Sequence, residues 1–167
     1  PRAQGGLYLA SDADDGRAMK RARDSSDEQK EKMVEEIIKT FSATWLPKQK
    51  APETSEVIAS LKGTRLMSVI EFGRDAHAEM EAILAAGRIG VSIRGQNLYS
   101  TTFPCHNCAK LIIASGLRRV VYIEPYPKSL AIELHSDSIF LGNNPPKEKN
   151  SATPVKFEPF VGVGPRK

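Results

Sequence analysis

Apolar residues in the first part of the chain recur with the period of an α-helix. Ser26 and Gln29 have the spacing of a capping box, in which each side chain satisfies a free amide of the first helical turn. Pro47 should end this helix, since proline cannot continue it. Residues 1–25 are expected to be irregular, apart from a short extended piece at 7–9. The apolar positions of the helix are Val34, Ile37, Ile38, Phe41 and Trp45.

In the middle of the chain the pattern predicts helices that alternate with strands. A helix is expected over 77–86, closed by Gly87, and a strand over 97–102. A second helix over 104–116 has a proline in its first turn, and a buried strand follows over 119–124. This order of elements argues for a layered α/β domain. The inward positions of the first of these helices are Met80, Ile83 and Leu84.

The remaining segments carry weaker signals. A short helix is expected at about 53–62 and another over 129–134. Asn, Pro and Lys are frequent over 142–154, which predicts a loop, and a late strand is expected over 155–161.

The length and composition fit a single domain. A chain of 167 residues, 40% of them apolar, can bury a core without disulfides. We expect one domain over 1–167, with a helical flank at 1–64, a core at 65–135 and a C-terminal loop and strand at 136–167. The longest apolar runs are far shorter than the ~20 residues of a spanning helix. Because the chain begins with Pro1 rather than methionine, we expect either a processed protein or an interior piece of a longer polypeptide.

The charge and the cysteine content indicate the cell compartment of the protein more clearly than its function. The net charge of +4 suits a nucleotide or nucleic-acid partner, but no block of like charges forms a binding tail. The chain has two cysteines, too few for a secreted disulfide scaffold. We therefore expect a reducing compartment, the cytoplasm, and metal or redox chemistry at the cysteines.

Two short motifs carry the chemistry: His77-Ala78-Glu79, and Pro104 through Cys108. One imidazole and two thiolates give zinc three ligands, and a catalytic zinc keeps its fourth position for water. Cys105 and Cys108 begin a predicted helix, where free amides and the helix dipole favour the thiolate form. Two helix N-termini that face each other could enclose one metal ion.

Glu79 adds a proton-accepting group beside this zinc site. A carboxylate next to zinc-activated water can take a proton and pass it to a ring nitrogen and then to a leaving amine. H-x-E together with P-C-x-x-C is the arrangement of the zinc-dependent nucleobase deaminases, in which the glutamate is not a ligand. The combination therefore favours a deaminase-type zinc site, with Glu79 as its catalytic residue.

Each part of the pattern also has a plainer interpretation. A lone C-x-x-C occurs as a redox pair or as half of a structural zinc site, although a structural site would want a fourth Cys or His. His106 lies between the two cysteines and should point away from the metal, and His135 is expected to be a surface or helix-cap residue.

The core segment resembles the deoxycytidylate deaminase family of the cytidine deaminase superfamily. The stretches that carry this resemblance are 77–83, 98–105, 108–113, Gly116 and 120–122. It implies a three-layer α/β/α fold with a mixed central sheet, a Zn²⁺ cofactor, and a homo-oligomer with sites near subunit boundaries.

The flanking residues resemble bacterial anti-phage dCTP deaminases more specifically. The stretches concerned are 69–74, 124–129, 157–163, Gly5 through Tyr8 and the helix after Ser26. Those proteins carry a P-loop kinase-like domain before the deaminase domain and deplete deoxycytidine nucleotides during infection. In this family the domain starts with a helix and a β-hairpin that helps to hold the sugar, and this chain begins where that hairpin should already have ended. The hairpin therefore either lies outside this chain or is absent, and its absence would remove a substrate contact and two strands of the sheet.

Substrate contacts follow from the motifs and the resemblance. The amide of Ala78 should touch the base, because it lies between the ligand and the acid. Phe103 is either a pyrimidine contact or a core aromatic residue. The resemblance places Tyr126 near the sugar or base and Lys128 near phosphate, against the alternative of plain surface residues.

The leading hypothesis is a zinc hydrolase that converts dCTP or dCMP to the uracil nucleotide and ammonia. One rival is a polynucleotide cytosine or adenine deaminase, disfavoured by 7% aromatic residues and dispersed basic residues. Another is an inactive module that keeps zinc for structure and works through oligomerisation; the missing hairpin favours it, and Glu79 counts against it. A thiol redox protein would leave His77 and Glu79 unexplained.

Overall fold

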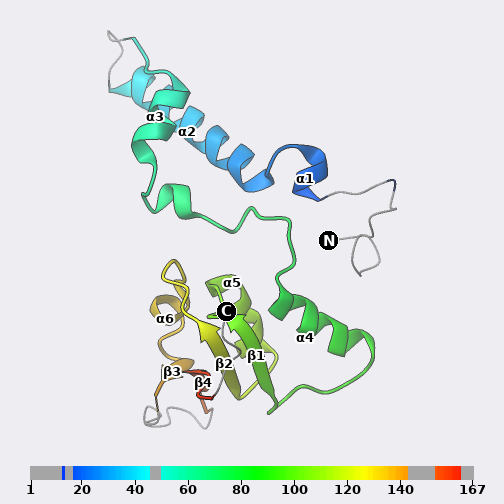
Figure 1. Ribbon diagram of the computed structural model, residues 1–167. Coiled ribbons are helices and arrows are strands. Elements are labelled where there is room, and N and C mark those ends of the chain that lie inside the picture. The colour runs from blue at the N-terminus through cyan, green and yellow to red at the C-terminus, as the bar shows by residue number, and fades with distance from the viewer. Residues whose placement is uncertain (1–12, 14–16, 46–49, 143–152, 163–167) are drawn as a thin grey trace. The chain divides into compact units, whose positions relative to one another are not determined.

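The protein is described here by a computed structural model that covers residue 13 and residues 17–45, 50–142 and 153–162 (Figure 1). The chain forms two compact units, Pro1–Asp75 and Ala76–Lys167. That these act as one deaminase domain stays a prediction. The expected extended piece at 7–9 and the helix end at Pro47 lie outside the described residues. No helix in the described ranges is long and apolar enough to cross a membrane.

The first unit is helical in its described part. It contains α1 (Ala18–Arg21), α2 (Ser25–Thr44), α3 (Thr54–Leu61) and a 3₁₀ turn (Leu66–Ser68). Helices α2 and α3 pack against each other (Figure 1). The two helices expected in this region are therefore confirmed.

Asp24, not Ser26, caps the N-terminus of α2, so the predicted capping box is wrong. The Asp24 carboxylate accepts a hydrogen bond from the Ser26 amide at 2.7 Å. The Ser26 hydroxyl donates instead to the carbonyl of Val69 at 3.3 Å, and the Ser25 hydroxyl to that of Phe72 at 2.9 Å. The two serine hydroxyls thus donate to backbone carbonyl groups far along the chain. The Asp24 carboxylate instead accepts the hydrogen bond from the free amide of the first helical turn.

Replacing Asp24 with alanine should destabilise this helical unit by about 1 kcal/mol, the usual cost of losing a side-chain N-cap. The measurement is urea unfolding of the full chain, monitored by its far-ultraviolet circular dichroism signal. Asp27→Ala is the matched control, because Asp27 lies in the same first turn, where it forms a 3.6 Å ion pair with Lys30. Equal losses in the two variants would contradict the capping role.

The apolar stripe of α2 is only partly buried. Val34 is fully buried, whereas Ile37, Phe41 and Trp45 are 44%, 51% and 72% exposed. With 8 residues, α3 is too short to cover the 20 residues of α2, so the far end of the stripe has no packing partner within α3.

The second unit is built on a parallel sheet. Its strands are β1 (Asn97–Thr102), β2 (Arg119–Glu124), β3 (Ile139–Leu141) and β4 (Val155–Pro159), in the order β1-β2-β4-β3. Every strand pair in the described residues is parallel. The α/β class is confirmed, but the expected mixed sheet is not seen here. The resemblance attributes the antiparallel strands of the family to an N-terminal hairpin that the described residues do not contain.

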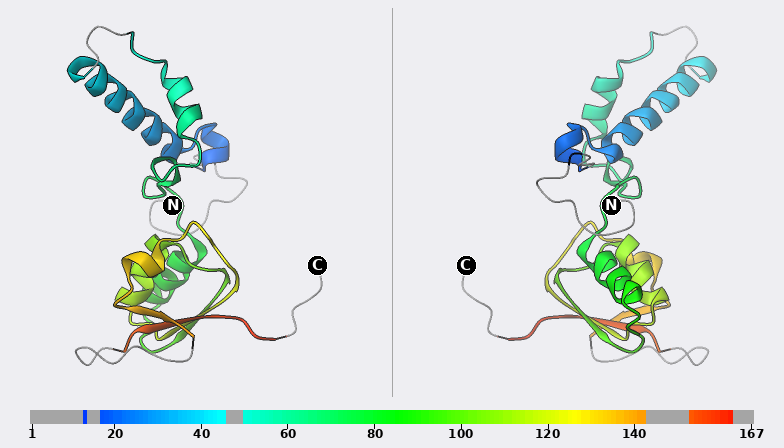
Figure 2. Two further views of the ribbon diagram at one scale, coloured as in Figure 1. Left: turned by 90° about the vertical axis from the view of Figure 1, so that its left-hand side faces the viewer. Right: turned by 90° about the vertical axis from the view of Figure 1, so that its right-hand side faces the viewer.

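Three helices cover one face of this sheet: α4 (Ala78–Arg88), α5 (His106–Ala114) and α6 (Ala131–Leu134) (Figure 2). Tyr99 and Ile123 lie on the other face and are 67% and 63% exposed. The described part of this unit thus supplies two of the three expected layers. The inside of the unit is formed by β2, β4 and α5; its fully buried side chains include Val120, Phe157, Cys108, Ala109 and Ile112.

Helix α4 runs past Gly87, which was expected to close it. The amide of Gly90 donates to the Gly87 carbonyl at 3.2 Å, and that of Val91 to the Ala86 carbonyl at 2.9 Å. This pair of bonds is a Schellman motif, and Gly90, with φ of 73°, supplies its left-handed residue. Leu84, expected to face inward, is 51% exposed.

Smaller differences concern the ends of elements. Helix α5 begins at His106 with Cys105 as its N-cap, so Pro104 lies outside the first turn where it was expected. Helix α6 and strand β4 are shorter than predicted by two residues each. Strand β3 was not predicted, because a run of three apolar residues is too short to show a period.

Candidate metal centre

His77 and the two cysteines sit at the N-termini of two neighbouring helices. His77 is the N-cap residue of α4, and Cys105 is that of α5. Cys108 lies in the first turn of α5, and its amide donates to the Cys105 sulfur at 3.5 Å. Cys105 therefore caps α5 with its sulfur, which stabilises negative charge on that atom.

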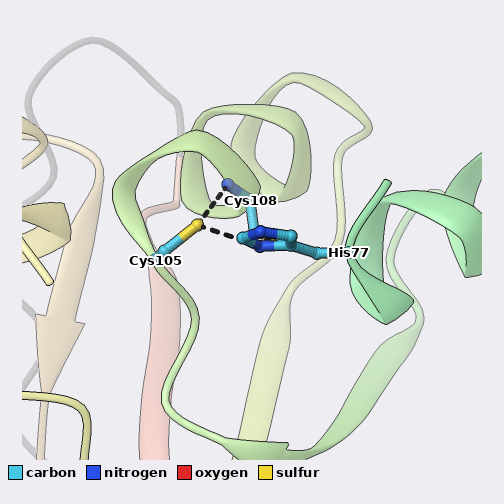
Figure 3. A group of neighbouring side chains, drawn as sticks. All are labelled: His77, Cys105 and Cys108. Carbon is cyan, nitrogen blue, oxygen red and sulfur yellow. Dashed lines mark hydrogen bonds between the residues drawn. The ribbon is translucent and has the colours of Figure 1, made fainter. Parts of the chain in front are cut away.

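The three side chains converge, as the motifs predicted (Figure 3). The His77 Nδ1 atom lies 3.4 Å from the Cys105 sulfur and 3.3 Å from the Cys108 sulfur. All three candidate ligand atoms lie within 4.8 Å of one another. Both cysteines are buried and His77 is half-buried. A borderline-soft divalent ion such as zinc fits this set of one nitrogen and two sulfurs, with a fourth position left for water.

The two thiols differ in acidity. A hydrogen bond from the Cys108 side chain, helped by the amides of the first helical turn and by His77, lowers the pKa of Cys105 to about 5. The same hydrogen bond, together with burial and the nearby Glu79, raises the pKa of Cys108 above its ordinary value. At neutral pH the metal-free centre therefore holds one thiolate and one thiol.

Zinc binding at pH 7 should consequently release about one proton from the two thiols, in addition to the part of a proton that a zinc-bound water with a pKa of roughly 7 gives up. Cys105 has already lost its proton above pH 5, whereas Cys108 must lose one to become a ligand. The measurement is calorimetric titration of metal-free protein with zinc in two buffers of different ionisation enthalpy. Release of two thiol protons, in addition to that of the water, would contradict a preformed Cys105 thiolate.

Glu79 lies beside the three candidate ligands, in the first turn of α4. Its Oε2 atom accepts a hydrogen bond from the Cys108 thiol at 3.6 Å. Its Oε1 atom accepts one from the Ser100 hydroxyl at 3.0 Å. The carboxylate thus has one oxygen toward the sulfurs and the other toward strand β1.

Ser100 is the site residue that the motifs missed. It lies on the helix-facing side of β1, which the two-residue period of a strand could have indicated together with Leu98 and Thr102. Its contact with Glu79, however, depends on how α4 packs on the sheet.

The expected substrate residues lie at the same edge of the sheet as the cluster. The Phe103 amide donates to the Glu124 carbonyl at 2.7 Å, and the Ser129 hydroxyl to the Pro104 carbonyl at 2.7 Å. The second bond ties the turn that carries Tyr126 and Lys128 to the loop before Cys105. Tyr126 is half-buried, and Lys128 and Ala78 are exposed.

Phe103 packs as a core aromatic residue. Its ring centroid lies 5.0 Å from that of Tyr122 and 5.5 Å from that of Phe157, both in edge-type contact. Neither His106, which is buried, nor His135 belongs to the cluster of candidate ligands.

Comparison with known families decides what kind of centre this is. The family described as the cytidine and deoxycytidylate deaminase zinc-binding region matches residues 17–124, well over half of the chain. The chain belongs to this family. The match and the His, Cys, Cys cluster together identify zinc as the metal of the site.

Several known proteins resemble this chain over a short region. A deoxycytidylate deaminase of Enterobacteria phage T2 is 49% identical over 55 residues, which are 33% of this chain and 29% of that protein. ComE operon protein 2 of Bacillus subtilis is 45% identical over 53 residues, 32% of this chain and 28% of that protein. The chain thus spans less than a third of the length of these relatives.

A solved structure also resembles this chain. The dCMP deaminase of cyanophage S-TIM5, crystallised in complex with dCMP and dUMP, aligns with a TM-score of 0.39 and 22% identity. The alignment covers 55% of this chain and 59% of that one.

Proposed function

We propose that this chain hydrolyses the amino group at C4 of a free deoxycytidine nucleotide, dCMP or dCTP, to give the uracil nucleotide and ammonia. The observation that carries the proposal is a carboxylate oxygen of Glu79 at 3.6 Å from the Cys108 sulfur, beside a His, Cys, Cys cluster. A structural zinc site has no use for a carboxylate in this place. The names of the phage relatives support deoxycytidylate as the substrate class.

In this proposal His77, Cys105 and Cys108 hold zinc, and Glu79 moves the protons. When bound, zinc lowers the pKa of a coordinated water to roughly 7 and so makes hydroxide available at neutral pH. Glu79 takes the proton of the water and delivers it to N3 of the cytosine ring. The C4–O bond forms, Glu79 takes the remaining proton from the new hydroxyl at C4 and delivers it to the amine, and the C4–N bond breaks as the C4 carbonyl forms. Water is consumed and ammonia leaves, so the atoms balance.

Binding of the substrate falls to residues around the cluster. We assign the Ala78 amide to the base, because Ala78 is exposed at the start of α4 between His77 and Glu79. Tyr126 and Lys128 follow the carboxyl end of β2, where parallel sheets bind ligands. We assign Tyr126 to the sugar or base and Lys128 to phosphate. Phe103 is a candidate contact for the pyrimidine, and its ring is held by contacts with Tyr122 and Phe157.

The wider context of the proposal rests on the resemblance of the flanking residues to anti-phage deaminases. We propose nucleotide depletion during infection as the role and the cytoplasm as the location, with dCTP or dCMP as the nucleotide that is removed. A homo-oligomer and a P-loop kinase-like domain in the same polypeptide are the expected partners. Sedimentation of the purified protein with and without dCTP tests the oligomer.

The deciding experiment offers dCMP, dCTP, CTP and a cytosine-containing single strand of DNA to zinc-loaded protein. Products are separated by chromatography, and Glu79→Ala is the control. Uracil nucleotide that forms from a deoxynucleotide and vanishes in the control supports the proposal and decides the phosphate state. Turnover of the single strand alone would favour a polynucleotide deaminase. Absence of any turnover by the zinc-loaded protein would contradict catalysis by this chain.

A further inference from the structure

The Glu79 carboxylate is held from two sides, and only one of them belongs to the cluster of metal ligands. Its Oε2 atom lies 3.6 Å from the Cys108 sulfur. Its Oε1 atom lies 3.0 Å from the hydroxyl of Ser100, which donates the hydrogen bond. Ser100 is not a ligand, and its hydroxyl has no part in the chemistry derived above.

Ser100 occupies a rigid place. It lies in the middle of β1 and pairs in register with Tyr122 of the neighbouring strand β2. Its side chain is half-buried beneath α4, which packs against β1. A serine hydroxyl on a paired strand has one short rotatable bond, so little freedom is lost when it holds a partner. Hydrogen bonds to a charged acceptor are also about twice as strong as those between neutral groups.

The glutamate needs such a partner, because its side chain is flexible. Glu79 is half-buried at the N-terminal end of a helix, and the cluster offers its carboxylate only a long contact to a sulfur. Without the serine hydroxyl, the carboxylate could rotate away from the cluster toward solvent. With it, the carboxylate plane is fixed so that Oε2 faces the sulfurs.

We propose that Ser100 is a positioning residue, which holds Oε1 of Glu79 so that Oε2 stays directed at the reacting water. This inference rests on the proposed function, since it assigns Glu79 the proton transfer. It predicts that the hydroxyl, rather than the size of the side chain, matters at position 100.

The test compares Ser100→Ala and Ser100→Thr with the unchanged protein on the deoxynucleotide that it turns over best. Ser100→Ala should lower kcat roughly tenfold, the equivalent of one hydrogen bond to a charged group, and leave KM within about twofold. Ser100→Thr keeps the hydroxyl and suits a strand, so it should restore most of kcat. Ser115→Ala is the matched control, because the Ser115 hydroxyl is also part-buried and donates to the Ile112 carbonyl at 2.9 Å, at the end of α5.

A second measurement is independent of turnover. Ser100→Ala should lower the thermal unfolding midpoint when Glu79 is present and leave it unchanged in a Glu79→Ala background. That difference shows that the two side chains interact. Zinc content, measured by atomic absorption, should be equal in all variants.

The outcomes separate this inference from the proposed function. If the unchanged protein turns over no substrate, the proposed function fails, and the positioning role fails with it. If the unchanged protein is active and Ser100→Ala keeps its kcat, only the positioning role is overturned. It is also overturned if Ser100→Thr is as slow as Ser100→Ala, or if the unfolding midpoints show no coupling.

Discussion

Replacing Glu79 with glutamine should nearly abolish deamination while the protein keeps its zinc. The amide has the shape of the carboxylate and can still accept the Ser100 hydrogen bond, but it cannot take a proton from water. Loss of a positioned general base and acid lowers rates by about 10²–10⁴-fold. The measurement is single-turnover conversion of the deoxynucleotide, together with zinc content from atomic absorption.

Glu81 provides the control for this prediction. It lies in the first turn of the same helix and forms an ion pair with Arg88 on the helix surface. Glu81→Gln removes the same charge and should leave kcat within about twofold, because the Glu81 side chain pairs with Arg88 and only its backbone amide is bonded to His77. A Glu79→Gln protein that retains the kcat of the unchanged protein would remove Glu79 from the mechanism.

The candidate ligands could be predicted because their placement depends on local structure. Cys105 and Cys108 are three residues apart at the start of a helix, so one turn brings both sulfurs to the same side. His77 begins the other helix by the same rule. Only the proximity of the two helix N-termini depends on the tertiary fold. The alternation of helix and strand in the chain already predicted an α/β domain.

The parts that were missed depend on contacts between distant residues. Ser26 was predicted to cap α2, but its hydroxyl bonds to Val69, 43 residues along the chain. The Ser100 contact with Glu79 spans 21 residues and depends on how α4 sits over β1. The sequence allows α4 to end at either Gly87 or Gly90. The two hydrogen bonds of the Schellman motif show that Gly90 is the residue that ends it.

The exposed apolar stripe of α2 shows that the sequence also does not predict how much of a helix face is buried. The helical period identified Ile37, Phe41 and Trp45 as one face together with Val34. Periodicity reports which residues share a face but not how long the partner helix is. Because α3 is short, only the Val34 end of the face is covered within the described residues of this unit.

Removing the imidazole of His77 should cost the protein its zinc and most of its activity. The Nδ1 atom lies 3.4 Å and 3.3 Å from the two sulfurs, so His77→Ala deletes one of three candidate ligands. Loss even of a residue that only supports a ligand weakens metal binding by about 10–100-fold, and loss of a ligand should exceed that range. Competition for zinc with a chromophoric chelator measures the change.

His135→Ala is the matched control, since His135 is a half-buried histidine of the same unit outside the cluster. It should bind zinc as the unchanged protein does. Zinc binds the folded state preferentially, so a thousandfold excess over the dissociation constant stabilises it by about 4 kcal/mol. A chelator should therefore lower the unfolding midpoint of the unchanged protein and of His135→Ala, and leave that of His77→Ala unmoved. If His77→Ala retains full zinc affinity and the same response to chelator, His77 is not a ligand, and the pairing of H-x-E with P-C-x-x-C loses its basis in this chain.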